Sequence, residues 1–295
     1  MFQGEDFRLR RRLPSHPPHA FTGDAASPAG FLPPRMPVSP AGVDPMGMAP
    51  YAPAPDNDAI ARMIGGRRIR IVGDVHGDLR AFRHAAATDR FLIQLGDLVD
   101  YGPDSVGTFR LMQQLIDEGR GLFVLGNHDR KLARALHGRK MRRDPPLMET
   151  LMQFQAPEND DVRMRAIDDL SMAPAWIVLG KYVFVHGGFH VRMLDEVPPP
   201  GLGTVTPLLS RALFGETTGR MQKDGYPERR LNWVDHIPAG YTVYCGHDRR
   251  STDGRPWVRT GRAGGTAIFT DTGAGKGGHL AWIDLPGIDP AAPAM

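Results

Sequence analysis

The sequence predicts an α/β fold, and three observations lead to this prediction. Short apolar runs rich in β-branched residues alternate with amphipathic segments over residues 67–125, in the order strand, helix, strand, helix, strand. Six apolar runs along the chain are each followed by a short motif that pairs glycine with an acidic, amide or imidazole side chain. A hydrophobic content of 41% and a charged content of 23% are ordinary for a globular domain.

The first half of the α/β region reads as three parallel strands joined by two helices. The first strand is predicted over residues 69–72, and Asp78 is placed to cap the helix that follows it. A second strand over residues 91–95 leads to a helix opened by Asp104. The third strand is predicted over residues 122–125.

The second half has a weaker pattern. Residues 130–175 are predicted to be helical. Residues 197–230 are rich in Pro, Gly and Thr, so we expect a long surface segment there, close to any site. Strands are predicted over residues 182–185, 241–244, 267–270 and 280–283.

The N-terminal 58 residues differ from the rest of the chain. They hold 12 of the 27 prolines and have neither a helical nor a strand period. Such a composition buries too little apolar area to offset the loss of backbone entropy. We therefore predict a disordered Pro-rich tail over residues 1–58 and one catalytic domain over residues 59–295.

Charge and cysteine content narrow the class of protein. The formal charge of +3 permits an anionic substrate but does not require nucleic acid. Cys245 is the only cysteine, which excludes an intrachain disulfide and suits a reducing compartment. No apolar run reaches the length of a membrane span, and no secretory leader is apparent. We expect a cytoplasmic enzyme with no membrane partner.

The six motifs carry the chemistry. Strand carboxyl ends in α/β sheets converge on one edge, so motifs that are distant in sequence can meet there. Their carboxylate, amide and imidazole groups are ligands for hard or borderline divalent metals. The motifs are Gly73-Asp74-Val75-His76-Gly77, Gly96-Asp97-Leu98-Val99-Asp100, Gly126-Asn127-His128-Asp129, His186-Gly187-Gly188, Gly246-His247-Asp248 and Asp271-Thr272-Gly273.

In this order, the motifs resemble those of the calcineurin-like metallophosphoesterase superfamily, and most closely its phosphoprotein-phosphatase branch. Within that branch, residues 211–219 and 271–278 are similar to bacterial Ser/Thr phosphatases, dinucleoside tetraphosphatases and the phosphatase module of polynucleotide kinase-phosphatase. The resemblance covers residues 67–285. It implies the metallo-dependent phosphatase fold, a four-layer αββα sandwich of two mixed sheets with the site at their shared edge.

The resemblance also implies a role for each site residue. Two divalent metal ions are expected, with Mn²⁺ preferred and Fe or Zn as alternatives. Asp97 bridges both ions, while His128 is the general acid and Asp100 orients it. The other ligands are Asp74 and His76 for the first ion, and Asn127, His186 and His247 for the second. Asp129, Asp248 and Asp271 are expected as supporting residues of the ligands.

The chain departs from the family pattern at Tyr101. The family places there an arginine that binds the substrate phosphate, and a phenol does not replace a bidentate cation. Another basic side chain is therefore expected to bind the phosphate. Of Arg211, Lys223, Arg230 and Lys276, we favour Arg211 and Lys276 because each lies in a family-like motif.

A basic run over residues 130–143 could follow a nucleic-acid backbone, but a solvated helix face is the simpler interpretation. Nucleic acid is therefore not the favoured partner. The function predicted first is the hydrolysis of phosphate monoesters by a metal-activated water, as in a bacterial Ser/Thr protein phosphatase. The alternatives are a nucleotide or nucleic-acid phosphoesterase, acting on dinucleoside tetraphosphates or on 3′- or 2′,3′-cyclic phosphates, and a weakly active phosphate-binding regulatory protein.

Overall fold

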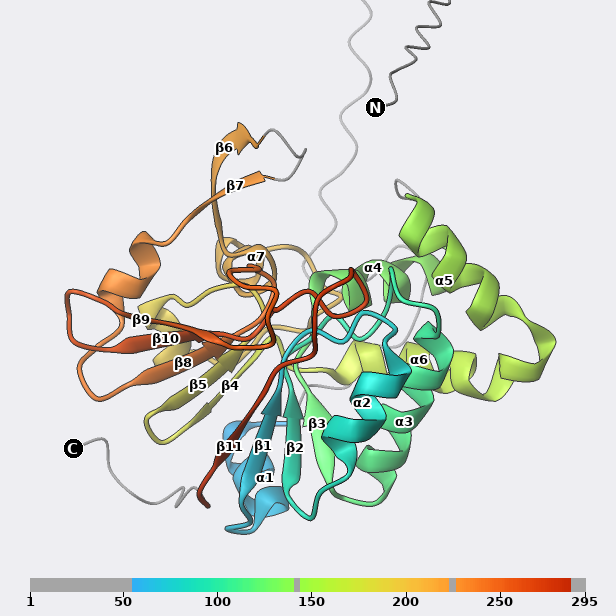
Figure 1. The fold of residues 1–295 in the computed structure, drawn as a ribbon, viewed down its shortest axis with the longest axis horizontal. Helices are drawn as coiled ribbons and strands as arrows, with labels where there is room; N and C mark the ends of the chain where they lie inside the picture. Colours follow the sequence, from blue (N-terminus) through green and yellow to red (C-terminus); the bar gives the residue numbers. More distant parts are fainter. Residues whose placement is uncertain (1–54, 141–143, 223–226, 288–295) are drawn as a thin grey trace, which may run out of the picture. The chain divides into compact units, whose positions relative to one another are not determined.

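The computed structural model describes residues 55–140, 144–222 and 227–287 (Figure 1). All described elements belong to one compact unit that spans residues 49–295. The predicted tail lies outside the described residues except for residues 55–58. The first helix, α1 (Asn57–Ile64), runs across the predicted boundary at residue 59. The tail and the domain boundary therefore stay predictions.

The first sheet carries the three predicted parallel strands, β1 (Ile69–Val72), β2 (Phe91–Gln94) and β3 (Gly121–Phe123). They are joined by α2 (Leu79–Ala86) and α3 (Ser105–Asp117). The last strand, β11 (Trp282–Leu285), lies antiparallel beside β1. It begins two residues later than predicted: Leu280 and Ala281 are buried, but the ladder starts where Trp282 pairs with Val72.

The second sheet is also mixed. Its parallel centre is formed by β5 (Tyr182–Val185), β8 (Thr242–Cys245) and β10 (Thr266–Phe269), which correspond to the predicted strands. Two antiparallel edge strands, β4 (Trp176–Leu179) and β9 (Trp257–Thr260), were not predicted. β4 pairs with β5 at one edge of the sheet and β9 pairs with β10 at the other, which gives the strand order β4-β5-β8-β10-β9.

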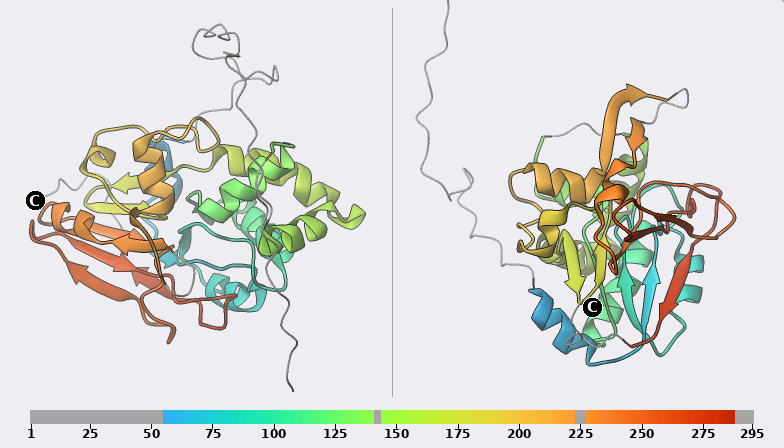
Figure 2. Two further views of the ribbon diagram at one scale, coloured as in Figure 1. Left: turned by 90° about the horizontal axis from the view of Figure 1, so that it is seen from above. Right: turned by 90° about the vertical axis from the view of Figure 1, so that its left-hand side faces the viewer.

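The two sheets face one another across a buried cluster. Ile71 and Ile93 from the first sheet meet Phe184 and Tyr244 from the second sheet in this cluster. Side chains alternate along a strand, so the next residues point to the outer faces. There Phe109 of α3 and Leu209 of α7 (Pro207–Phe214) belong to a second cluster. Two mixed sheets flanked by helices confirm the predicted four-layer fold (Figure 2).

Three helices follow β3, in agreement with the predicted helical stretch. They are α4 (Asn127–Leu136), α5 (Pro145–Gln155) and α6 (Asp160–Met172), with the 3-10 turn η1 (Pro157–Asn159) between the last two. All three contact one another, and α3 also contacts α5 and α6. This packing places α4, which carries the Gly126–Asp129 motif at its start, on a rigid support.

The predicted surface segment over residues 197–230 is more regular than expected. It holds α7 and a hairpin of β6 (Glu216–Met221) and β7 (Pro227–Arg230), which projects from the body in Figure 1 and in the right-hand view of Figure 2. Two 3-10 turns, η2 (Val191–Leu194) and η3 (Asn232–His236), flank this segment. The hairpin is largely exposed, so its sequence lacks the apolar alternation that predicts a strand.

Candidate active site

The six motifs meet at one edge of the sandwich. Those of the first sheet follow β1, β2 and β3, and those of the second sheet follow β5, β8 and β10. Both oxygens of Asp74, after β1, accept a hydrogen bond at 3.1 Å from the backbone nitrogen of His247, after β8. The two sheets are therefore joined at the site itself. This agrees with the expectation that the carboxyl ends of the strands converge on one edge.

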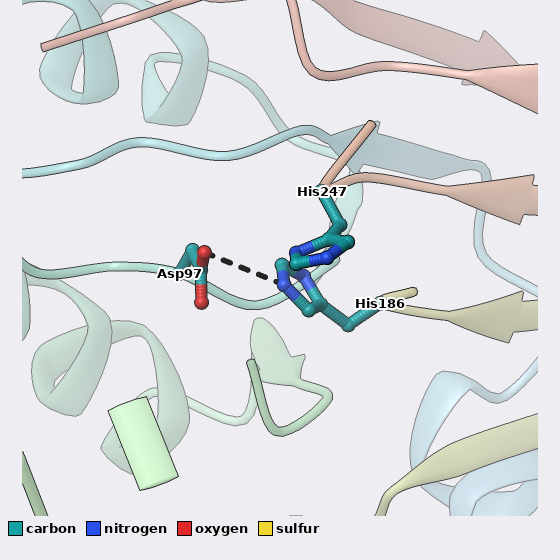
Figure 3. Close-up of side chains that lie close together, drawn as sticks. All are labelled: Asp97, His186 and His247. Atoms are coloured by element: carbon teal, nitrogen blue, oxygen red, sulfur yellow. Dashed lines mark ion pairs between the residues drawn. The ribbon is translucent and has the colours of Figure 1, made fainter. Parts of the chain in front are cut away.

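Two clusters of possible metal ligands share one carboxylate. The first consists of Asp74, His76 and Asp97, and the second of Asp97, His186 and His247, with the ligand atoms of each cluster within 4.8 Å of one another. Asp97 Oδ2 lies 3.7 Å from His76 Nε2 and 3.3 Å from His186 Nε2. Figure 3 shows Asp97 and the two histidines of the second cluster facing a common point.

The backbone at these residues is held in an uncommon conformation. Among the described non-glycine residues, those with a positive φ are His76, Asp97, Asp100, Tyr101 and His247. Such conformations are unfavourable for side chains other than glycine and gather at functional sites. Gly246 permits the close approach of the two sheets, because a Cβ there would lie 2.0 Å from Asp74 Oδ1.

Hydrogen bonds at Nδ1 leave Nε2 as the metal-binding atom of two histidines. His76 Nδ1 donates to the carbonyl oxygen of Val99 at 2.9 Å, and His186 Nδ1 donates to that of Leu95 at 2.8 Å, so each Nε2 can present a lone pair. Nε2 of both His76 and His247 is buried without a hydrogen-bond partner. Burial lowers the pKa of both of these rings well below the ordinary value, which favours their neutral form.

Asp74 and Asp97 repel one another when both are ionised, so a positive charge between them would stabilise the pair. Burial, followed by the nearby Asp271, raises the pKa of Asp74 well above its usual range. Burial opposes ionisation of Asp97 too, but His186 and His128 outweigh it and hold the pKa of Asp97 well below its usual range. Acidic groups crowded around unpartnered imidazole nitrogens fit divalent metal ions. Asn127 lies at the second cluster, with Oδ1 3.0 Å from His186 Nε2.

His128 stands beside these clusters and is fixed at several atoms. Its backbone nitrogen donates to Asp97 Oδ1 at 2.8 Å, and its Nδ1 lies 2.6 Å from Asp100 Oδ2. Thr150 donates to the other oxygen of Asp100 at 2.7 Å. Asp100 is thus placed where it could orient His128, the role that the resemblance implies and that stays a prediction. Lys131, which the sequence did not single out, lies 2.9 Å from Asp100 Oδ2 and extends the pair.

The three expected supporting aspartates do not contact the ligand histidines through their side chains. Asp129 instead accepts backbone hydrogen bonds from Asp97 at 2.7 Å and Leu98 at 2.9 Å, so it fixes the residue that the two clusters share. Asp248 pairs with Arg250. Asp271 is buried and accepts from the backbone nitrogen of Gly273 at 2.9 Å, which forms the turn after β10.

Of the two favoured phosphate-binding residues, only Lys276 lies at the clusters. Its ammonium group sits 4.5 Å from the ring centre of Tyr101, whose ring in turn contacts those of His76 and His128 at 5.1 Å and 5.2 Å. Arg211 instead pairs with Glu216 at 2.7 Å and lines a different hollow with residues such as Trp233. The role of Arg211 at the phosphate stays a prediction.

The other two candidates for the phosphate are Arg230 and Lys223. Arg230 lies 3.9 Å from Glu216, the carboxylate that also pairs with Arg211. Lys223 lies outside the described residues.

A hollow of about 130 Å³ opens beside His247. Three basic side chains, Arg229, Arg249 and Lys276, line it, and we call it the cationic hollow. Asp248, Asp271, Gln222 and Pro227 complete its wall. The sequence offered a signal for Arg249, which directly follows the Gly246-His247-Asp248 motif, but none for Arg229 in the hairpin.

The basic run over residues 130–143 does not form one cationic face. Arg130 is buried and donates to the carbonyl oxygens of Gly201 at 2.7 Å and Gly203 at 3.0 Å. Lys131 is engaged with Asp100 and with Asp144, 3.1 Å away. Residues 141–143 lie outside the described residues. The two members nearest the site therefore have structural partners, and this removes the main support for a nucleic-acid track.

Comparison with known proteins decides the family. A model of the calcineurin-like phosphoesterase family matches residues 67–216, half of the chain. The chain belongs to this family. As a calcineurin-like phosphoesterase it is a phosphoric ester hydrolase, and its Asp–His clusters imply divalent metal ions. The resemblance inferred from the six motifs is confirmed.

Several curated relatives of this calcineurin-like phosphoesterase are similar over most of their length. It is 27% identical to the asymmetrical bis(5′-nucleosyl)-tetraphosphatase PrpE of Geobacillus thermodenitrificans, covering 74% of this chain and 90% of the relative. It is 29% identical to the symmetrical bis(5′-nucleosyl)-tetraphosphatase of Nitrosospira multiformis, covering 74% and 76%.

A solved structure described as a putative diadenosine tetraphosphatase matches with a TM-score of 0.50 at 24% identity, covering 76% of this chain and 95% of that one. This match confirms the fold. In the part of the chain that the structure describes, no helix is long and apolar enough to cross a membrane.

Proposed function

We propose that this protein is a metal-dependent hydrolase of bis(5′-nucleosyl) tetraphosphates. The observation that carries the hydrolysis is the pair of Asp–His clusters that share Asp97, with His128 alongside. The substrate class is supported by the curated relatives, which include both symmetrical and asymmetrical tetraphosphatases. A phosphoprotein phosphatase, the function predicted first from the sequence, has less support than this alternative.

The residues present fit two divalent ions. Asp74 and His76 would hold the first ion, Asn127, His186 and His247 the second, and Asp97 both. Mn²⁺ is the ion we propose, with Fe or Zn as alternatives, because mixed oxygen and nitrogen donors suit all three. When bound, such ions polarise the phosphoryl group and lower the pKa of a coordinated water.

His128 supplies the proton for the leaving oxygen in this proposal. With Nδ1 turned to Asp100, the ring is left with Nε2 as the atom that can give a proton to substrate. Asp100 cannot swing away, because Thr150 and Lys131 hold its two oxygens. The role of Asp100 is therefore to position His128, and the role of Lys131 is to hold Asp100 in place.

Lys276 is the proposed cation for the reacting phosphoryl group. Its ammonium group lies over the ring of Tyr101, the position at which the family has arginine. A lysine binds phosphate as a point charge and lacks the two parallel hydrogen bonds of a guanidinium. We infer that simple monoesters are bound weakly and that affinity depends on further phosphates of the substrate.

A substrate panel tests the proposal. The metal-stripped, Mn²⁺-reloaded protein is assayed with nitrophenyl phosphate, bis-nitrophenyl phosphate, a phosphothreonine peptide, diadenosine tetraphosphate and a 2′,3′-cyclic nucleotide. The expected result is a kcat/KM for diadenosine tetraphosphate at least about tenfold above the others. Chromatography of the products distinguishes cleavage at the central bridge, which gives two nucleoside diphosphates, from cleavage at an outer bridge, which gives a mono- and a triphosphate.

Two results would contradict the proposal. A clear preference for the peptide would restore the protein-phosphatase function. No turnover with Mn²⁺, Fe or Zn would favour the phosphate-binding regulatory protein instead. Asp97→Asn serves as the inactive control, because it weakens the one ligand that both clusters share.

A further inference from the structure

The cationic hollow differs from the metal clusters in its chemistry. It borders the second cluster through His247, but its other basic members, Arg229, Arg249 and Lys276, come from β7, the loop after β8 and the loop after β10. Its volume of about 130 Å³ is below the range of pockets that hold drug-sized molecules. Its basic lining suits a compact anion such as a phosphate group.

The three cations have no anionic partner of their own. In the described part of the chain, no carboxylate lies within ion-pair distance of any of them. The two acidic residues of the wall are engaged elsewhere, Asp248 with Arg250 and Asp271 with the backbone nitrogen of Gly273. The three cations outnumber the two carboxylates of the wall, so an anion that enters the hollow is attracted there.

Arg229 is the more firmly held of the two arginines, since Arg249 is exposed. Arg229 is half-buried and donates to the carbonyl oxygen of Phe214 through one of its terminal nitrogens. The stem of Arg249 packs on Gly273, where a Cβ would lie 3.1 Å from Arg249 Cδ. A guanidinium with little freedom left loses less entropy when it binds phosphate oxygens.

We propose that the cationic hollow is the subsite for the phosphate groups that neighbour the reacting one in a polyphosphate chain. Arg229 and Arg249 bind those phosphates, while Lys276 stands between them and the metal clusters. This inference rests on the proposed function, since it assumes that the reacting phosphoryl group lies at the clusters. At this subsite, the substrate is selected by its number of phosphates and not by its nucleoside.

Inhibition of nitrophenyl phosphate hydrolysis tests the subsite. Tripolyphosphate and orthophosphate are compared as inhibitors, with free Mn²⁺ held constant so that chelation does not imitate inhibition. The wild type is expected to bind tripolyphosphate at least about tenfold more tightly than orthophosphate, because charge-assisted contacts to arginine are strong. Arg249→Met should lose about tenfold in affinity for tripolyphosphate and less than about twofold for orthophosphate.

The chain offers matched controls. Arg249 is exposed, so its substitution should leave the melting temperature unchanged. Arg249→Lys should restore part of the affinity, and Arg229→Met should repeat the loss independently. Arg230→Met removes a neighbouring charge that faces Glu216, and it should leave the affinity for tripolyphosphate unchanged. Calorimetric titration of both anions into metal-free protein gives a second readout that needs no turnover.

The two proposals fail in different ways. Equal affinity of the wild type for both anions, or no change in Arg249→Met, overturns the subsite even if diadenosine tetraphosphate is cleaved. A strong preference for tripolyphosphate that depends on Arg249, without cleavage of diadenosine tetraphosphate, keeps the subsite and overturns the proposed substrate.

Discussion

His128 is the residue whose role depends most on the substrate. A general acid matters when the leaving oxygen is basic, and contributes about 10² to 10⁴ in rate. His128→Ala should therefore reduce kcat on phenyl phosphate by about 100-fold or more, and on nitrophenyl phosphate by less than about tenfold, since nitrophenolate leaves without a proton. Steady-state kinetics with both esters at one pH measure the difference.

Equal losses on the two esters would contradict the acid role and point to a purely structural one. His84→Ala is the matched control, because the ring of His84 packs against Trp282, 5.6 Å away, rather than in the site. It should leave both rates within about twofold of the wild type.

Single residues were predictable where a local motif carried them. Asp74, Asp97 and His186 each directly follow glycine or an apolar strand, so the sequence placed them at one sheet edge. Arg249 directly follows the Gly246-His247-Asp248 motif, but Arg229 has no such local pattern, and the hollow that they share exists only after three segments have folded together. Lys131 was closer to detection, since it lies one helical turn after His128.

Helix α1 decides where the folded domain begins. Asp56 caps it by accepting from the backbone nitrogen of Ala59 at 2.7 Å, and Ile60 and Ile64 are buried in the cluster between the sheets. Removing residues 1–54 should leave the melting temperature and turnover unchanged. Removing residues 1–64 should destabilise the protein by about 3 kcal/mol or more, since two buried isoleucines are lost.

Thermal unfolding of the two truncated proteins measures this. Equal stability of both would mean that α1 is dispensable. Loss of stability in the shorter truncation would contradict the predicted passive tail.

Helix α4 is tied to the loop before α7 through Arg130. Its guanidinium donates to two backbone carbonyl oxygens, those of Gly201 and Gly203, and the residue is only 6% exposed. Arg130→Met should reduce the free energy of unfolding by about 2 kcal/mol, because hydrogen bonds from charged groups contribute more than neutral ones and burial of the charge offsets only part of this. Urea denaturation measures the loss.

The control for this change is Arg68→Met, which removes an exposed ion pair with Asp89. Such pairs contribute at most about 1 kcal/mol, so little change is expected. If both variants lose the same stability, Arg130 does not have the anchoring role described.

Elements were predictable when they were buried and regular. The strands β1, β2 and β5 are nearly or fully buried and appear as apolar runs, so the sequence located them to within about one residue. The edge strand β9 is mostly exposed, and its residues include Arg259, so no such run marks it. The hairpin of β6 and β7 was missed for the same reason, since neither strand has a buried face.

At the scale of the whole molecule, stability should depend on pH in opposite ways with and without metal. Burial alone would lower the pKa of His186, but Asp97 outweighs it and raises that pKa to about 9 in the metal-free protein. The folded state then holds a proton that the unfolded chain releases near its ordinary value of about 6.5. The resulting stabilisation is complete below pH 6.5 and is lost as pH rises to about 9.

Metal-free protein should therefore lose stability over this range, on the order of 3 kcal/mol, since each pKa unit corresponds to about 1.4 kcal/mol. His76 and His247, whose pKa values are lowered, add a small opposite slope that fades within about one pH unit above 6.5, while Asp129, whose pKa is raised to about 7 by burial, adds to the loss. Mn²⁺-loaded protein should gain stability instead, because metal competes with protons for the same ligands. Thermal unfolding at pH 6.5, 7.5 and 9, with and without Mn²⁺, measures both slopes.

The variant His186→Gln isolates the cause, since it removes the titrating ring at the centre of the second cluster. Its metal-free form should show a much flatter dependence on pH than metal-free wild type. A metal-free wild type that is equally stable at pH 6.5 and 9 would contradict the prediction, as would a Mn²⁺ stabilisation that shrinks with rising pH. Either result would mean that the strongly coupled Asp97–His186 pair does not carry the charge that the second metal ion replaces.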